Sequence, residues 1–299
     1  MAQPVAEILH DGIRLLGFSL AGEETYFVAP ELNLAFDVGR CQRHVLAVDH
    51  VFLTHGHMDH AAGIAYYFSQ RMFIDNAPGH VYAPEPLVEP LHRLLRVWAD
   101  IDGREPPGNI HPAIPDQDIP LRRDLLVRPF VVNHPCRRHD RSLVQALGFA
   151  AIEVRQKLLE EYRDLTGPQL VELKRQGVQI TRRIEIPLVA YCGDTAPGDF
   201  LDLDCVRDSK ILLLECTFVE PDHRTRAAAG SHMHVSYLRD IIPRLNNERI
   251  VLTHLSRRTS LTDARQHLRR ELGPVTDERI SFLMEHRRRR RPRSDKPES

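Results

Sequence analysis

The segment that decides the fold of this chain reads Val51-Phe-Leu-Thr-His55-Gly-His57-Met-Asp59-His60. It places three histidines and one carboxylate within six positions, directly after a short apolar run. In an extended segment, side chains two residues apart share a face, so a His-x-His pair directs two imidazoles to the same side. Asp59 and His60 then add an oxygen and a third nitrogen where we expect a helix to begin. So many ligands in one loop favour two adjacent metal ions, which in two-metal sites lie about 3.5–4 Å apart.

The composition is that of a folded globular protein. The 299 residues are 42% hydrophobic and 27% charged, which supports a buried core and argues against disorder. No apolar run approaches the roughly 20 residues of a membrane span. Residues 1–20 lack the basic and apolar segments of a secretion signal. The five cysteines are widely spaced and form no Cys-x-x-Cys pair, so we expect free thiols, without a catalytic role, in a reducing, cytoplasmic compartment.

The charge is unevenly spread along the chain. Seven of the 40 basic and three of the 41 acidic residues lie in 285–299, which leaves residues 1–284 with a net charge of −5. We therefore expect one folded domain over 1–284, followed by a basic, disordered tail over 285–299. The tail has two open roles: contact with nucleic acid phosphates, or a solvated segment without a ligand.

Apolar periodicity predicts alternating strands and helices, and hence an α/β protein. Strands are expected at 14–20, 25–28, 34–38, 51–54, 125–132, 186–191, 210–214 and 249–253. Helices are expected at 61–69, 87–98, 154–165, a short stretch ending at 175, 240–245 and 262–272. The apolar stripe of 87–98 is expected to pack in the core, and residues 103–120, rich in Pro and Gly, are expected to form a loop.

Three further polar residues directly follow predicted buried strands. Asp194 lies in the segment Cys192-Gly-Asp-Thr195, where Gly193 allows a tight backbone turn. His254 follows the strand 249–253. His134 follows Phe130-Val-Val-Asn, and His139 competes with it for the same role. Ligand sites in α/β proteins favour such strand ends, so we expect these side chains to meet the His55–His60 loop.

The ligands suffice for two metal ions. One ion would take His55, His57 and His134, and the other would take Asp59, His60 and His254, with Asp194 bridging them. This leaves open positions for water and substrate, as catalytic metals require. Imidazole favours zinc, and carboxylate is compatible with it, so two divalent ions of zinc type are expected.

The cluster resembles the His-x-His-x-Asp-His signature of the metallo-β-lactamase fold. The resemblance implies a four-layer αββα sandwich with a dinuclear metal site at the sheet edges. It also matches Asp37, in Phe36-Asp37-Val38-Gly39, to the family's aspartate ahead of the cluster, where it would orient a ligand.

Two other stretches resemble the ribonuclease Z branch of this fold. The segments 214–218, Leu-Glu-Cys-Thr-Phe, and 230–234, Gly-Ser-His-Met-His, are similar to that branch's Glu-Ala-Thr segment and its partner histidine. Residues 252–258, Leu-Thr-His-Leu-Ser-Arg-Arg, are similar to its Leu-Thr-His-Phe-Ser-x-Arg.

The resemblance implies a two-zinc phosphodiesterase that hydrolyses RNA, with precursor tRNA 3′ ends as a candidate substrate, through a hydroxide held between the metals. Asp59 would orient or deprotonate the attacking water. Glu215 and His232 would form an acid dyad that protonates the departing 3′ oxygen. Relatives of this kind also imply a homodimer.

Two alternatives stay open at this point. A small-molecule metallohydrolase of the same fold would act on a thioester, lactone or cyclic nucleotide, and a non-enzymatic protein would have kept only the fold. The Gly-Pro-rich arm with which the best-known members clasp tRNA is not recognisable between residues 150 and 190. Arg137, Arg138 and Arg141 would supply phosphate contacts in its place, or else lie solvated on the surface.

Overall fold

The short apolar runs of the sequence form two mixed β-sheets in the computed structural model, which describes residues 5–74, 78–106, 108–273 and 279–287. The first sheet has, in spatial order, β1 (Ala6–His10), β2 (Ile13–Leu20), β3 (Glu24–Ala29), β4 (Leu34–Phe36), β5 (His50–Phe52), β6 (His80–Pro84) and β7 (Asn109–Ala113). The second has β14 (Ile280–Phe282), β13 (Arg249–Thr253), β12 (Ile211–Glu215), β11 (Thr181–Tyr191), β10 (Leu143–Leu158), β9 (Leu125–Arg137) and β8 (Ile119–Arg122).

Aromatic side chains hold the two sheets face to face. The ring of Phe52 on β5 lies 5.3 Å from that of Phe149 on β10. Tyr191 on β11 contacts Phe27 and Phe36 of the first sheet, with ring centroids 5.1 and 5.5 Å apart. These tilted contacts have the geometry that aromatic pairs prefer, and the rings are fully buried. The main hydrophobic core therefore lies between the sheets.

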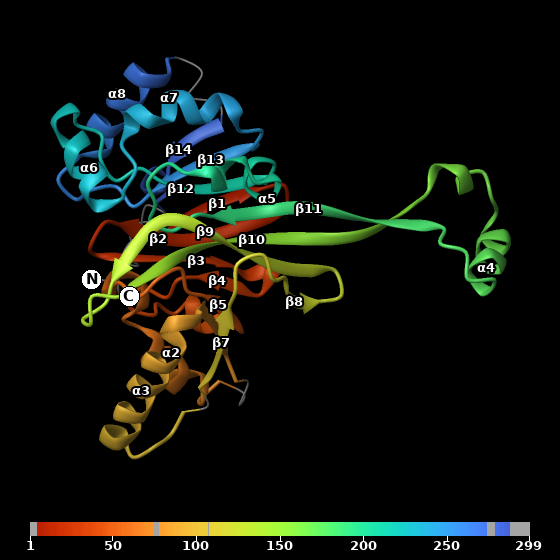
Figure 1. Cartoon of the computed structure of the whole chain (residues 1–299), viewed down its shortest axis with the longest axis horizontal. Helices are drawn as coiled ribbons and strands as arrows, with labels where there is room; N and C mark the ends of the chain where they lie inside the picture. Colours follow the sequence, from red (N-terminus) through yellow and green to blue (C-terminus); the bar gives the residue numbers. More distant parts are fainter. Residues whose placement is uncertain (1–4, 75–77, 107, 274–278, 288–299) are drawn as a thin grey trace, which may run out of the picture.

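Helices cover the outer faces of both sheets (Figure 1). The first sheet carries α1 (Met58–Ala61), α2 (Ile64–Arg71) and α3 (Glu85–Asp102), and the second carries α5 (Asp204–Arg207), α6 (Arg224–Gly230), α7 (Leu238–Ile241) and α8 (Leu261–Leu272). Within the described residues, no helix is long and apolar enough to cross a membrane. The four layers confirm the predicted αββα sandwich.

A long two-stranded arm replaces the helix that we predicted over 154–165. Strands β10 and β11 pair out to Leu158 and Thr181, and α4 (Gly167–Arg175) closes the arm at its tip, far from the sandwich (Figure 1). The prediction was wrong because Val154 and Leu158 lie four residues apart, a spacing that fits one face of a strand as well as one face of a helix. An arm therefore lies between residues 150 and 190, where the sequence shows no recognisable Gly-Pro-rich arm.

Two other expectations need correction. Residues 103–120, predicted as a loop, contain β7, which extends the parallel part of the first sheet beside β6. Helix α3 carries two apolar stripes, and only one packs in the core. Leu95 is buried, but Leu94 and Trp98, which the same prediction assigned to the core, are exposed together with Val97 and Ile101.

The predicted basic tail lies mostly outside the described residues, which end at residue 287. Within the described part, the Glu285 carboxylate accepts hydrogen bonds from Arg265 of α8 and from the backbone N–H of Phe282. Arg287 forms an isolated β-bridge with Ala6 of β1. Through these contacts, residues 285–287 pack against both sheets.

Candidate metal centre and active site

Parallel pairing brings the predicted ligands to one edge of the sandwich. Strands β4 and β5 are parallel, and so are β11, β12 and β13. Residues that follow these strands therefore meet at the same end. Asp194 lies beyond β11, Glu215 ends β12, and His254 follows β13. The His55–His60 loop follows β5 of the other sheet.

The backbone is unusual at three of these strand ends. Gly193 has a φ of +59°, and a Cβ there would lie 3.0 Å from the Thr54 side chain, so glycine lets the Asp194 turn approach the first sheet. Asp37 and His254 adopt left-handed conformations, with φ of 54° and 56°. Such conformations in non-glycine residues cost energy and concentrate at functional sites.

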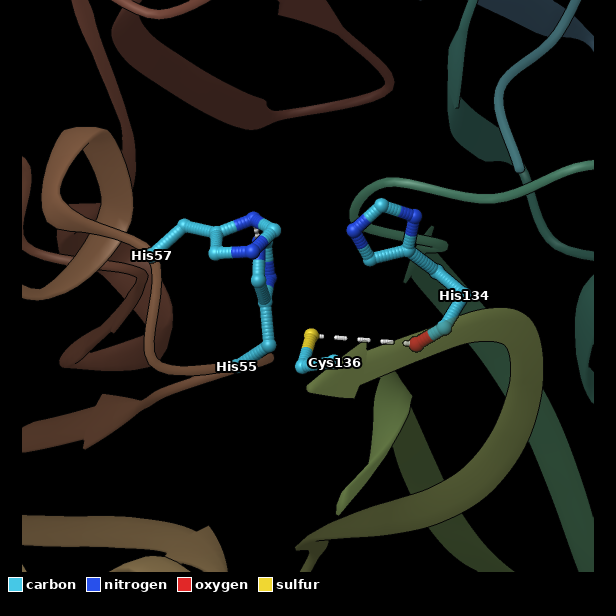
Figure 2. A group of neighbouring side chains, drawn as sticks. All are labelled: His55, His57, His134 and Cys136. Carbon is cyan, nitrogen blue, oxygen red and sulfur yellow. Dashed lines mark hydrogen bonds between the residues drawn. The ribbon is translucent and has the colours of Figure 1, made fainter. Parts of the chain in front are cut away.

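One group of ligand atoms comes from His55, His57, His134 and Cys136, all within 4.8 Å of one another. Figure 2 shows His55 and His57 on the loop after β5, facing His134 and Cys136 on β9. His55 Nε2 lies 3.0 Å from His57 Nδ1. His139, the alternative to His134, is exposed in the turn after β9. The structure thus brings the three histidines predicted for one ion together, and adds a cysteine.

A second group comes from Asp59, His60 and His254. His254 Nε2 lies 3.3 Å from Asp59 Oδ2, which also accepts a hydrogen bond from the backbone N–H of Gly22. Asp194 lies between the two groups: its Oδ1 is 3.3 Å from His60 Nε2 and 3.4 Å from His254 Nε2, and its Oδ2 is 3.7 Å from His55 Nε2. This is the place that the prediction gave to a bridging carboxylate.

Asp37 orients two of the histidines. Its carboxylate contacts His60 Nδ1 at 2.7 Å, and accepts hydrogen bonds from the Tyr191 hydroxyl at 2.8 Å and from Thr54 Oγ1 at 2.9 Å. Thr54 Oγ1 in turn lies 2.9 Å from His55 Nδ1. Because the Nδ1 atoms are engaged, the Nε2 atoms of both rings are turned toward the centre, the arrangement typical of metal-binding histidines.

Thr217, beside the second sheet, orients His254 in the same way that Thr54 orients His55. Its hydroxyl donates to Glu215 Oε2 and lies 3.1 Å from His254 Nδ1. The backbone N–H of His254 is held by Ser19 Oγ of β2 at 2.8 Å. The sequence analysis assigned no role to Thr54 or Thr217, although each lies at a strand end beside a predicted site residue.

The donor set fits divalent cations. Within the described residues, the buried atoms His60 Nε2, His134 Nε2 and Asp194 Oδ1 make no hydrogen bond, and a buried polar atom without a partner is costly. Burial lowers the pKa of His60, but the Asp194 and Asp37 carboxylates raise it well above its usual value. Burial raises the pKa of Asp194, but His254 and His60 bring it well below its usual value. The carboxylates thus favour positive charge at the centre of the pocket, which a bound cation would supply.

Glu215, which is fully buried, and His232, which is partly exposed, form a pair beside this centre. His232 Nδ1 lies 2.8 Å from Glu215 Oε1, and Glu215 also accepts hydrogen bonds from the backbone N–H groups of Thr195 at 2.6 Å and Met233 at 3.1 Å. Burial lowers the pKa of His232, but the Glu215 carboxylate raises it to about 9. The Glu215 carboxylate thus favours the protonated form of the His232 ring.

A cleft of about 680 Å³ opens onto these groups. Its walls include His57, Asp59, Asp194, His232 and His254, so residues of both ligand groups and the imidazole of the pair reach the same space. Three arginines also line it: Arg226, Arg257 and Arg258. The cleft combines metal ligands, a proton donor and positive charge, which suits an anionic substrate.

Comparisons with known proteins agree with this geometry. A family model described as "Beta-lactamase superfamily domain" matches residues 21–158. The metallo-beta-lactamase fold protein YhfI from Bacillus subtilis has a similar structure, with a TM-score of 0.58 and 15% identity over 89% of this chain and 92% of that one. This likeness shows the fold of a metallo-β-lactamase-type protein.

Relatives found by sequence similarity show to which branch of this fold the chain belongs. A chloroplastic tRNase Z of Arabidopsis thaliana is 31% identical over 84% of this chain and 69% of its own length. A second tRNase Z of the same plant is 30% identical over 85% of this chain and 89% of its own. The chain therefore belongs to the ribonuclease Z family, also called tRNase Z, and is a metal-dependent hydrolase that uses divalent ions. The predicted fold and branch are confirmed.

Proposed function

We propose that this protein is a two-zinc endoribonuclease that hydrolyses a phosphodiester at the 3′ end of precursor tRNA. The observation that carries the proposal is that possible metal ligands of both groups and His232, which is paired with Glu215, open onto one arginine-lined cleft. The names of the relatives, which are tRNases Z, support RNA as the substrate. The imidazole-rich donor set supports zinc among the divalent ions.

The metal ligands in this proposal are the seven residues brought together at the sheet edge: His55, His57, Asp59, His60, His134, Asp194 and His254. Two divalent ions bound there would supply a water nucleophile at neutral pH and neutralise phosphate charge. Burial raises the pKa of Asp59, but the hydrogen bond with His254 lowers it, to about 2. Asp59 lines the cleft and would orient or deprotonate the attacking water.

His232 donates the proton that the leaving group needs. A departing ribose 3′ oxygen is strongly basic, and general acid catalysis of this kind contributes about 10²–10⁴-fold. Glu215 holds the ring through Nδ1 and keeps it protonated. Arg226 and Arg258, which are exposed in the cleft, hold the phosphates that flank the scissile bond.

The test compares two substrates. His232→Ala should lower kcat on precursor tRNA by about 10²-fold or more. It should change the hydrolysis of bis(p-nitrophenyl)phosphate far less, because p-nitrophenolate departs without a proton. His223→Ala is a matched control: His223 also pairs with a glutamate, Glu220 at 3.0 Å, and is as exposed as His232, but it does not line the cleft.

Equal loss on both substrates would argue against a proton donor at His232. Metal-dependent hydrolysis of a thioester, lactone or cyclic nucleotide without RNA cleavage would instead establish a small-molecule hydrolase.

We also propose that the protein is a cytoplasmic homodimer. All five cysteines are unpaired and buried, which suits a reducing compartment. Exposed apolar side chains of α2 and α3, Tyr66, Val97, Trp98 and Ile101, support a protein contact there, because soluble proteins rarely leave such groups together in water. A fluorescent fusion observed in cells would test the compartment.

A further inference from the structure

We propose that the Cys136 thiolate is a further protein ligand of the ion held by His55, His57 and His134. The inference rests on the proposed metal centre and adds a residue to it. The sequence predicts free thiols without a catalytic role, and Cys136 is the one cysteine in the described residues whose sulfur lies in a group of possible ligands.

The pleat of β9 places Cys136 beside His134. Val132, His134 and Cys136 alternate with exposed residues along the strand, so all three share its buried face. Cys136 Sγ and the ligand nitrogens of His55, His57 and His134 lie within 4.8 Å of one another. Figure 2 shows the sulfur below the space between the His55 and His134 rings.

An independent observation indicates that a cation belongs in this space. His134 is only 4% exposed, and its Nε2 finds no hydrogen-bond partner in the described part of the chain. Its Nδ1 already lies 3.1 Å from the carbonyl oxygen of Ser231. Figure 2 shows the His134 ring turned toward His55 and His57, with Cys136 next to the same space. The ring therefore offers Nε2 to a ligand at this place.

Cys136 would add a thiolate to the three imidazoles and the shared Asp194 carboxylate, a set of ligands that suits zinc. The thiol proton leaves to solvent as sulfur binds the ion, and the three imidazole ligands are neutral nitrogens. A thiolate favours zinc over hard ions such as Mg²⁺ and Mn²⁺. Because this ion would then be held largely by protein, water and substrate would approach from the side of Asp59, His60 and His254, where the distances to Asp194 are shorter.

Cobalt substitution tests the inference without measuring activity. Full-length protein is depleted of metal and titrated with Co²⁺, and its absorption is recorded. Wild type should show visible bands of bound cobalt and a near-ultraviolet thiolate-to-cobalt charge-transfer band. Cys136→Ser should lose the near-ultraviolet band completely and keep visible bands. It should also bind cobalt at least about tenfold more weakly, because the loss of a residue that only supports a metal ligand already lowers metal affinity by about that factor.

Two further variants make the result decisive. Cys205→Ser should keep both bands, because Cys205 is as buried as Cys136, at 7% against 9% exposed, but lies in no ligand group of the described residues. Cys136→Val retains an apolar side chain if the serine variant fails to fold, and should also lose the charge-transfer band. Visible bands in wild type without charge transfer, or a band that survives in Cys136→Val, would overturn the role of Cys136 alone. Wild type that binds no cobalt would overturn the metal centre itself.

Discussion

Each histidine of the site behaves according to the neighbours that its ring meets. His55 and His232 are both largely buried, and burial lowers the pKa of both. For His55 this effect dominates, and the pKa falls well below the usual value. For His232 the Glu215 carboxylate dominates and raises the pKa. The surroundings thus favour a neutral ring at His55, the form that binds a metal, and a protonated ring at His232, although the two side chains have the same intrinsic chemistry.

The elevated pKa of His232 predicts how activity depends on pH. The protonated ring is the active form, so RNA cleavage should fall as the pH rises through about 9. The ion pair also stabilises the fold fully below the usual histidine pKa of about 6.5, and this contribution is lost as the pH rises through about 9. Initial rates on precursor tRNA between pH 6 and 10, corrected for loss of folded protein, measure the first effect.

Glu215→Gln provides the control for this pH profile. The substitution keeps the size of the side chain but removes the charge that holds the proton, so the alkaline limb should shift to lower pH. If the alkaline limb of the profile stays near pH 9 in this variant, the limb reports the titration of a group other than His232.

At the scale of secondary structure, the elements that carry the site were predicted from the sequence more accurately than the elements that surround it. The strand 249–253 agrees with β13, and Ser260 caps α8 by accepting from the backbone N–H of Asp263. The arm was not predicted from the sequence, because its β10–β11 pairing joins residues more than twenty positions apart, such as Leu158 and Thr181. An apolar spacing of four residues does not reveal whether such a partner exists.

The exposed arm leads to a prediction about RNA binding. Its basic side chains, Lys157, Lys174 and Arg182 among them, are exposed beyond the sandwich. Replacing residues 157–182 with an Asn-Gly turn, which suits an antiparallel hairpin, should leave the metal centre intact. The KM for precursor tRNA should rise about tenfold or more, with a weaker dependence on salt. Steady-state kinetics at two salt concentrations measure both.

Hydrolysis of bis(p-nitrophenyl)phosphate is the internal control for the arm deletion, and should be unchanged because that substrate is too small to reach the arm. A deletion variant that retains the wild-type KM for precursor tRNA would remove the arm from substrate binding.

The whole molecule assembles its site from both sheets. Asp37 and the His55–His60 loop come from the first sheet, and His134, Asp194 and His254 come from the second. Backbone contacts fix the relation between the sheets: Leu147 donates its N–H to the Thr54 carbonyl at 3.0 Å, and Ala21 donates to that of Leu255 at 3.1 Å. Neither half alone has a complete ligand set, so metal binding and the docking of the sheets stabilise each other.

Assembly of two chains is the prediction at this scale. Wild type should sediment at twice the chain mass of 34.3 kDa. Ile101→Glu should sediment as a monomer, because it places a charge on the exposed apolar stripe of α3, where Ile101 is 67% exposed. Leu143→Glu, at a leucine 60% exposed on β10, should remain dimeric. Sedimentation equilibrium distinguishes these outcomes, and a monomeric wild type would contradict the proposal.

The sequence alone indicated the candidate ligands and their order, because a His-x-His-x-Asp-His loop, and polar residues directly after apolar strands, are local patterns. It also indicated the Glu215 and His232 pair, through similarity to known segments. Tertiary structure alone decided which histidine near residue 134 faces the centre, that Thr217 reaches His254, and that Cys136 lies beside the three-histidine group. These contacts depend on strand register and on how two sheets dock, and those are set by interactions between residues far apart in the chain.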